Sequence, residues 1–207
     1  AFFPAGLVSR WYIEQFCYED KVKAQEQNMK FFEFLDAAME KSCHGPTGLC
    51  ITPHWVGSCN PYWDVRATGV MAGLTPQITR HHVYKAIYEG IACELAINAT
   101  ALIEVVGEFE SIKINGGNAR SHFTVQLRAD LTGKQFYTLK TSEAVCQGAA
   151  ILAGIAAGIY KDAEDAVQKV VRTDVLYKPN MDSKEQYEGQ MEKYKLLYPS
   201  LKSIRAV

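Results

Sequence analysis

The stretch 111–130 shows the clearest change of hydrophobic pattern in the chain. Ile112 and Ile114 alternate with polar neighbours, which is the two-residue period of a strand, and Gly116-Gly117 ends the alternation. Beyond these glycines, three apolar residues recur at the four-residue step of one helical face: Phe123, Leu127 and Leu131. The pattern therefore predicts a strand, a glycine turn and a helix.

This turn has two interpretations. Adjacent glycines let a backbone turn sharply and approach a ligand closely, and the helix that follows offers unpaired N–H groups at its start. Such a geometry is suited to a nucleotide. A plain strand-to-helix connection has the same appearance, however, and on these residues alone it is the favoured interpretation.

Predicted strands and helices extend on both sides of this stretch. We expect strands at residues 49–51, 69–74 and 135–139, and helices at residues 18–41, 79–106, 141–157, 162–171 and from Asp182 onwards, where Asp182-x-x-Glu185 resembles a capping box. The helix after residue 141 is rich in Gly and Ala, so its backbone can lie close to a neighbour or a ligand. Strands that alternate with helices after residue 110 predict an α/β fold with some parallel pairing.

Three further features have both a structural and a functional interpretation. His81 and His82 lie at the start of the longest helix. They either contact a ligand or are ordinary surface histidines, and the second interpretation is favoured. The loop 53–68 either lines a cleft or packs on the surface with Trp63 as its anchor. On the last helix, four residues form a stripe that we expect to be core packing rather than a cofactor site: Tyr187, Met191, Tyr194 and Tyr198.

Composition narrows the class of protein. The 207 residues, 48% of them hydrophobic, are enough for one large globular domain, and a net charge of -1 with a pI near 6.6 gives no support for a nucleic-acid partner or an anionic membrane surface. The longest apolar run, at residues 149–159, is too short to span a membrane, and the first residues do not resemble a signal peptide. We therefore expect a soluble cytoplasmic protein.

Cysteine usage agrees with that compartment. The six cysteines are scattered and form no C-x-x-C pair, which indicates reduced thiols rather than a disulfide framework. Cysteine and histidine do gather between residues 43 and 59, but their spacing does not fit paired zinc ligands. No metal site is predicted.

A longer pattern lies between residues 69 and 89. Ten positions in order match a signature of small, apolar and acidic residues: Gly69, Met71, Gly73, Leu74, His82, Val83, Ala86, Ile87, Tyr88 and Glu89. With this pattern the chain resembles the C-terminal lobe of the FGGY carbohydrate kinases, which belong to the actin and Hsp70 ATPase superfamily. Three shorter motifs agree with the resemblance: residues 116–121, residues 126–133 and residues 143–150. The first residues are similar to the branch that holds the autoinducer kinases, with xylulokinases as more distant relatives.

The resemblance implies a fold and a nucleotide site. The fold would be a ribonuclease H-like α/β lobe with a mixed sheet flanked by helices, spanning residues 1–207. Gly116 and Gly117 would let adenosine lie against the backbone, and Asn118 and Ser121 would supply polar contacts. Asn118 stands where the family often has a third glycine, and Ser121 is also a candidate N-cap of the helix. Ser58 and Cys59 replace the Glu and Arg of the family's G-E-R-x-P-x-W-D, which leaves the sugar open.

The resemblance also implies what lies outside this chain. Kinases of this family carry the D-x-G-T-x-S phosphate loop and the catalytic aspartate in an N-terminal lobe, and neither occurs here, so we assign no catalytic residue. The intact enzyme would use ATP and Mg²⁺ to phosphorylate a sugar hydroxyl, with its own N-terminal lobe as partner, and this chain alone would be inactive. The alternative is a non-catalytic nucleotide-binding or regulatory protein of the same superfamily. The sequence does not determine the oligomeric state, and a homo-oligomer is one of the alternatives.

Overall fold

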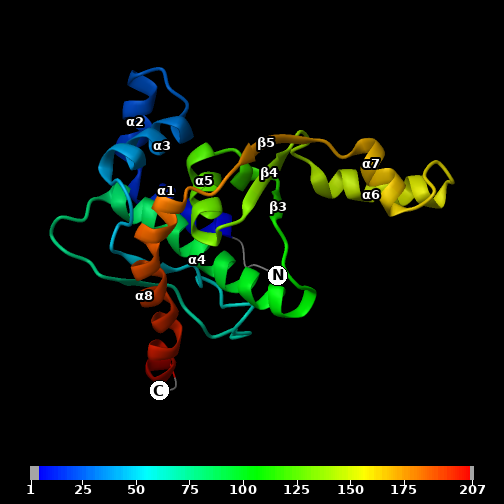
Figure 1. Ribbon diagram of the computed structural model, residues 1–207. Helices are drawn as coiled ribbons and strands as arrows, with labels where there is room; N and C mark the ends of the chain where they lie inside the picture. Colours follow the sequence, from blue (N-terminus) through cyan, green and yellow to red (C-terminus); the bar gives the residue numbers. More distant parts are fainter. Residues whose placement is uncertain (1–4, 206–207) are drawn as a thin grey trace.

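The computed structural model describes residues 5–205, which form eight α-helices, five strands and one short 3-10 helix within that range. Figure 1 shows their arrangement around the long central helix α4. In chain order they are α1 (Ala5–Phe16), α2 (Tyr18–Glu26), α3 (Phe31–Ser42), β1 (Cys50–Thr52), β2 (Val70–Ala72), α4 (Arg80–Val106), β3 (Ser111–Ile114), η1 (Gly117–Ala119), α5 (His122–Thr132), β4 (Gln135–Leu139), α6 (Ala144–Ala156), α7 (Ala163–Val170), β5 (Thr173–Tyr177) and α8 (Met181–Arg205).

Helix α4 forms the centre of the main hydrophobic core. It contacts α1, α3, α5, α8 and β1, and its residues Ala86, Ile87 and Ala92 are buried. Strand β1 approaches so closely that a Cβ added at Gly90 would lie 1.8 Å from the carbonyl oxygen of Ile51, so only glycine fits there. By length and composition α4 also passes as a membrane-spanning helix, but 56% of its most apolar window is buried inside the protein, which is typical of a core helix.

The strands form two sheets. β1 and β2 pair antiparallel, whereas the larger sheet has the order β3-β4-β5, with β3 parallel to β4 and β4 antiparallel to β5. Helix α5 covers one face of this sheet, where Val125 and Ala129 pack on Phe136 and Tyr177 in a second buried cluster. The predicted α/β fold with a mixed sheet is therefore confirmed. Because β3 and β4 are parallel, their carboxyl ends lie at the same edge of the sheet.

Several predicted boundaries were wrong. The single helix expected at residues 18–41 is two helices, because Asn28 adopts a φ of 51° and the backbone N–H of Met29 donates back to the carbonyl of Ala24. The strand β5 was not expected. The last helix begins one residue before Asp182, and its cap is Asn180, whose Oδ1 accepts from the backbone N–H of Asp182 at 3.0 Å.

The stripe on α8 is core packing, as predicted, but its tyrosines also hold acidic groups. Tyr187, Tyr194 and Tyr198 are buried, and their hydroxyls donate to Glu89, Glu94 and Asp64 respectively. A buried tyrosine needs a partner for its hydroxyl, and these acids provide one. The stripe thus fixes α8 to α4 and to the loop 53–68.

Candidate functional site

The turn after β3 has a conformation that requires glycine. Gly116 adopts a φ of 77° and a ψ of -164°, a region that other residues rarely occupy. Gly117, Asn118 and Ala119 then form η1, closed by the backbone N–H of Ala119 donating to the carbonyl of Gly116 at 3.1 Å. A Cβ added at either glycine would meet no heavy atom within 4 Å. The backbone of the turn is therefore open to a ligand on that side.

Ser121 is the N-cap of α5. Its Oγ accepts from the backbone N–H of Thr124 at 3.2 Å, which is the structural role expected for it. The hydroxyl also lies next to Asp36 on α3. Burial raises the pKa of Asp36, and a hydrogen bond from Ser121 partly offsets that rise. Ser121 thus connects the turn to α3 while it caps α5.

The structure brings the predicted site residues together. Gly116, Gly117, Asn118 and Ser121 all lie within the connection from β3 to α5, at the sheet edge where the parallel strands β3 and β4 end. Ligands of open parallel sheets bind beyond the carboxyl ends of the strands, so this position suits a ligand site. Sequence reasoning missed Asp36, because an acid within the helical pattern of residues 18–41 gave no signal that α3 reaches this turn.

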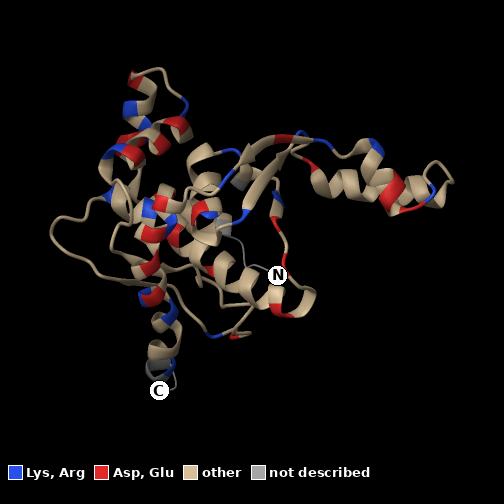
Figure 2. Cartoon of the chain, in the orientation of Figure 1, with Lys and Arg blue, Asp and Glu red and all other residues tan. Residues whose placement is uncertain are grey.

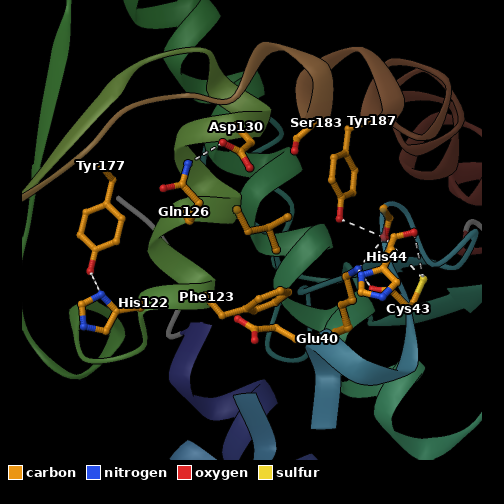
Figure 3. A pocket seen from close by; sticks show the side chains of 13 residues that line it. Glu40, Cys43, His44, His122, Phe123, Gln126, Asp130, Tyr177, Ser183 and Tyr187 are labelled. Carbon is orange, nitrogen blue, oxygen red and sulfur yellow. Dashed lines mark hydrogen bonds between the residues drawn. The ribbon is translucent and has the colours of Figure 1, made fainter. Parts of the chain in front are cut away.

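A cavity of about 520 Å³ lies beside the turn, not in it. It begins at His122 and Phe123, directly after Ser121, and follows α5 to Asp130 (Figure 3). The ends of α3 and β5, the first turns of α8 and Lys85 of α4 complete its wall. Gly116, Gly117 and Ser121 do not line it. The cavity and the glycine turn are therefore neighbouring but separate features.

Several polar groups of this cavity have partners within the protein. Lys85 donates from Nζ to the carbonyls of Cys43, at 2.8 Å, and Gly45. The carboxylate of Asp130 accepts from Gln126 at 2.7 Å and from the backbone N–H of Asn180 at 2.8 Å, and burial still raises its pKa. The bonds of Asp130 join α5 to the start of α8, and those of Lys85 join α4 to the loop after α3. In this structure both groups therefore stabilise the fold.

Close packing explains the two glycines at the start of the signature at residues 69–89. A Cβ added at Gly69 would lie 2.3 Å from the ring of Trp55, and one at Gly73, where φ is 93°, would lie 2.8 Å from the carbonyl oxygen of Gly48. Glu89 is fully buried at the other end of the pattern. Gly69 and Gly73 therefore have no room for a larger side chain.

Glu89 is the centre of a buried hydrogen-bond network. Its carboxylate accepts from Thr47, from Tyr187 at 3.0 Å and from Gln190 at 2.7 Å. Burial raises its pKa even so. The network connects α4 to α8 and to the loop before β1, which is a structural role.

The two histidines at the start of α4 also have structural roles. Nε2 of His81 donates to the buried carboxylate of Asp20 at 3.0 Å, and His82 lies 2.7 Å from the hydroxyl of Thr79 in the capping box of α4. Neither lines the cavity. The structural interpretation is the one that the geometry supports.

The loop 53–68 packs differently from either expectation. Trp63 is 71% exposed, so it is not the anchor. Tyr62 stacks on Tyr198 with 3.8 Å between ring centroids, and Asp64 accepts from the Tyr198 hydroxyl at 2.9 Å. The loop is thus held to α8, and it does not line the cavity.

Residues 5–205 contain neither a cluster of metal ligands nor a disulfide. The side chains described there include no group of three or more His, Cys, Asp or Glu that could hold a metal ion. All six cysteines are free thiols, and Cys146 on α6 is exposed. The fit of a nucleotide therefore rests on the open backbone of the glycine turn.

Known proteins similar to this chain are carbohydrate kinases. The xylulose kinase of Staphylococcus epidermidis is 32% identical over 180 residues, which are 87% of this chain and 36% of that kinase. A glycerol kinase of Clostridium perfringens is 38% identical over 119 residues, 57% of this chain and 24% of that kinase. The chain thus spans about a third of the length of the curated relatives it matches.

Solved structures show the same fold. A ligand-bound xylulose kinase from Lactobacillus acidophilus superimposes with a TM-score of 0.79 at 24% identity, covering 95% of this chain and 38% of that one. A glycerol kinase from Plasmodium falciparum with ADP gives 0.75 at 25% identity, covering 97% and 38%. The expected ribonuclease H-like ATPase lobe is thereby confirmed.

The family model for the FGGY family of carbohydrate kinases, C-terminal domain, matches residues 2–157. The match includes the signature at residues 69–89, the glycine turn and α6. By this match, and by its likeness to the xylulose kinase, the chain belongs to the FGGY family of carbohydrate kinases.

Proposed function

We propose that this chain is the nucleotide-binding C-terminal part of an ATP-dependent kinase that phosphorylates a sugar hydroxyl. The observation that carries the proposal is the turn at residues 116–121, where the backbone is open, glycine is required and the helix α5 begins. The glycerol kinase with ADP has the same fold, which supports a nucleotide here. In this proposal residues 1–207 form one lobe, and the rest of the kinase supplies the phosphate loop and the catalytic base.

The residues of the turn would have distinct roles. Gly116 and Gly117 would admit adenosine against the backbone, since neither carries a Cβ that would occupy the open side. Ser121 would supply a polar contact, with Asp36 beside it orienting its hydroxyl. Asn118, whose side chain lies outside the described part of the structure, is expected to supply a second one. ATP, once bound, supplies the phosphoryl group that is transferred.

The reacting phosphate would lie away from these residues. Mg²⁺ would be held by the phosphates of the nucleotide together with one or two carboxylates, which we place in the rest of the kinase. The similar proteins include xylulose and glycerol kinases, which makes a small polyol or ketose the proposed acceptor class. The six free thiols support a cytoplasmic location as part of this proposal.

An assay of the protein expressed from its complete reading frame tests the proposal. We expect ATP-dependent phosphorylation of a sugar or polyol in a panel that includes xylulose, gluconate and glycerol. Gly117→Val should weaken nucleotide binding at least roughly tenfold, because its side chain would occupy the space of the ligand. Gly189→Val on α8, another glycine with no atom within 4 Å of its Cβ, is the matched control and should bind normally.

Two results would count against the proposal. Equal nucleotide affinity for the Gly117→Val variant and the wild type would remove the site from the turn. Nucleotide binding without phosphorylation of any acceptor would favour a non-catalytic nucleotide-binding regulator instead.

A further inference from the structure

Helix α6 is unusual among the helices of this chain because it is both apolar and exposed. Its thirteen residues, AVCQGAAILAGIA, include no charged side chain, and Figure 2 shows the helix free of the charges that mark the others. Val145 is 87% exposed and Leu152 is 69% exposed. A helix that is apolar on all sides is normally buried, so this surface lacks its partner in the present structure.

The neighbours of α6 within the chain cover little of it. It packs mainly against α7, with which it projects from the larger sheet and away from the core around α4 (Figure 1). Gly154 is buried under the ring of Tyr160, and Gln147 donates to the carbonyl of Val170 at 3.0 Å. These contacts fix the orientation of the α6–α7 pair, but they leave Val145 and Leu152 exposed.

The chemistry of the two helices differs in a way that indicates which one meets a partner. α7 is amphipathic, with Glu164, Asp165 and Lys169 toward solvent and Ala166 fully buried, so its outer face is a normal solvated surface. The exposed face of α6 instead combines alanines with Val145 and Leu152. Small residues let another backbone approach closely, and the larger ones anchor the contact.

The topology places this surface next to the nucleotide turn. β3 and β4 are parallel, so the turn after β3 and the helix after β4 both start at the same edge of the sheet. A structure that covers the first turn of α6, where Val145 lies, therefore also comes close to whatever is bound at Gly116 and Gly117. This is where a second part of a kinase has to lie in order to act on the phosphates.

We propose that α6 is the docking surface for the segment of this protein that precedes residue 1, with Val145 and Leu152 as its anchors. The inference rests on the proposed function, because it takes the chain to be part of a longer kinase. The 180 residues aligned with the xylulose kinase are only 36% of that relative, so the greater part of such an enzyme has no counterpart here. That segment is large enough to bury a helix of about 20 Å, at 1.5 Å per residue.

Cys146 provides a direct probe, because it lies on α6 and its thiol is exposed. We would measure its rate of labelling by a maleimide in this 207-residue chain and in the protein from the complete reading frame. Labelling should slow at least roughly tenfold in the longer protein, since a docked surface excludes the reagent. A cysteine placed by Glu188→Cys, exposed on α8 at the other side of the molecule, should react equally in both.

Leu152→Asp tests the anchor. Because Leu152 is already exposed, the substitution should leave the thermal midpoint of the 207-residue chain unchanged, whereas in the longer protein it should restore fast labelling of Cys146. Three results would overturn the proposal: fast labelling of Cys146 in the longer protein, no preceding segment in the reading frame, or protection in the 207-residue chain together with a dimeric sedimentation coefficient, which would assign the surface to a second copy.

The same experiment separates this proposal from the proposed function. If the longer protein phosphorylates a sugar while Cys146 stays reactive, the proposed function is supported and the docking surface on α6 is overturned. If Cys146 is protected but no acceptor is phosphorylated, the docking surface is supported and the kinase function is overturned.

Discussion

Single buried carboxylates join distant elements of this chain. Asp20 accepts from Arg80 and His81, Glu89 from Tyr187 and Glu94 from Tyr194 at 2.8 Å. Glu94 also lies 2.9 Å from Nε2 of His54, which follows β1. A buried acid is costly without partners, so each of these residues depends on donors from other elements.

Asp20 gives a prediction with a defined pH dependence. Burial alone would raise its pKa, but hydrogen bonds from Arg80 and His81 hold the pKa below its ordinary value of 3.8. Asp20 therefore stabilises the fold above pH 3.8, and this contribution is lost as the pH falls through the lower folded pKa. Asp20→Asn should reduce the free energy of unfolding by about 2 kcal/mol at pH 7. Urea denaturation between pH 7 and pH 3 would show the difference shrinking at the acid end.

Glu19 is the matched control for Asp20. It also pairs with Arg80, at 3.0 Å, but its side chain is 67% exposed, so solvent screens the interaction. Glu19→Gln should change stability by less than about 0.5 kcal/mol at any pH in this range. A loss as large as that of Asp20→Asn would show that the pairing with Arg80, and not burial of Asp20, sets the effect.

At the scale of elements, the connection from β3 to α5 depends on one glycine more than the other. Gly116 has a positive φ that only glycine adopts readily, whereas Gly117 does not, and neither has atoms within 4 Å of its Cβ position. Gly116→Ala should therefore cost about 1–2 kcal/mol of stability through backbone strain. Gly117→Ala should cost less than about 1 kcal/mol. Chemical denaturation of both variants checks this, and equal stability would contradict the conformation described for the turn.

The sequence predicted most elements, and the misses have physical reasons. The long helices were found because their buried faces repeat every three or four residues, as in α4 and α5. The break between α2 and α3 was not predicted, because the residue at the break is Asn28 and not the glycine or proline that usually marks one. Strand β5 was missed because it is an edge strand with four of its five residues exposed, so its pairing with β4 left no alternating pattern.

The geometry of the candidate site could be predicted in part, whereas the role of its residues in binding a nucleotide stays a prediction. Gly116, Gly117 and Ser121 could be predicted because backbone conformation and helix capping are local properties. Asp36 and the cavity could not, because they depend on how α3 and α8 pack against α5, which no short pattern encodes. The exposed apolar face of α6 was also unexpected. Its small residues predicted a close neighbour, and within the described part of the chain that neighbour is mainly α7.

For the whole molecule, the residues beyond the family match belong to the same core. The match ends at residue 157, yet α8 buries Tyr187, Tyr194 and Tyr198 against α4, β1 and the loop 53–68. Loss of one such buried aromatic costs about 3–5 kcal/mol, and a domain is stable by only about 5–15 kcal/mol. A chain that ends at Lys178 should therefore lose cooperative unfolding.

Circular dichroism during thermal denaturation would measure this loss. A chain that ends at Lys202 is the control, since it keeps all three tyrosines and should unfold as the full chain does. If the shorter chain still unfolded cooperatively at a similar temperature, α8 would be an appendage and not part of the core.

Backbone NMR on titration with ADP shows whether the turn at residues 116–121 binds the nucleotide. In the ¹⁵N-labelled chain, the amide resonances of Gly116, Gly117 and Ser121 should shift with a common saturation curve, and Gly117→Val should abolish the shifts. Unchanged resonances at these three residues at millimolar ADP, or shifts confined to Gln126, Asp130 and Ser183 around the neighbouring cavity, would contradict the account.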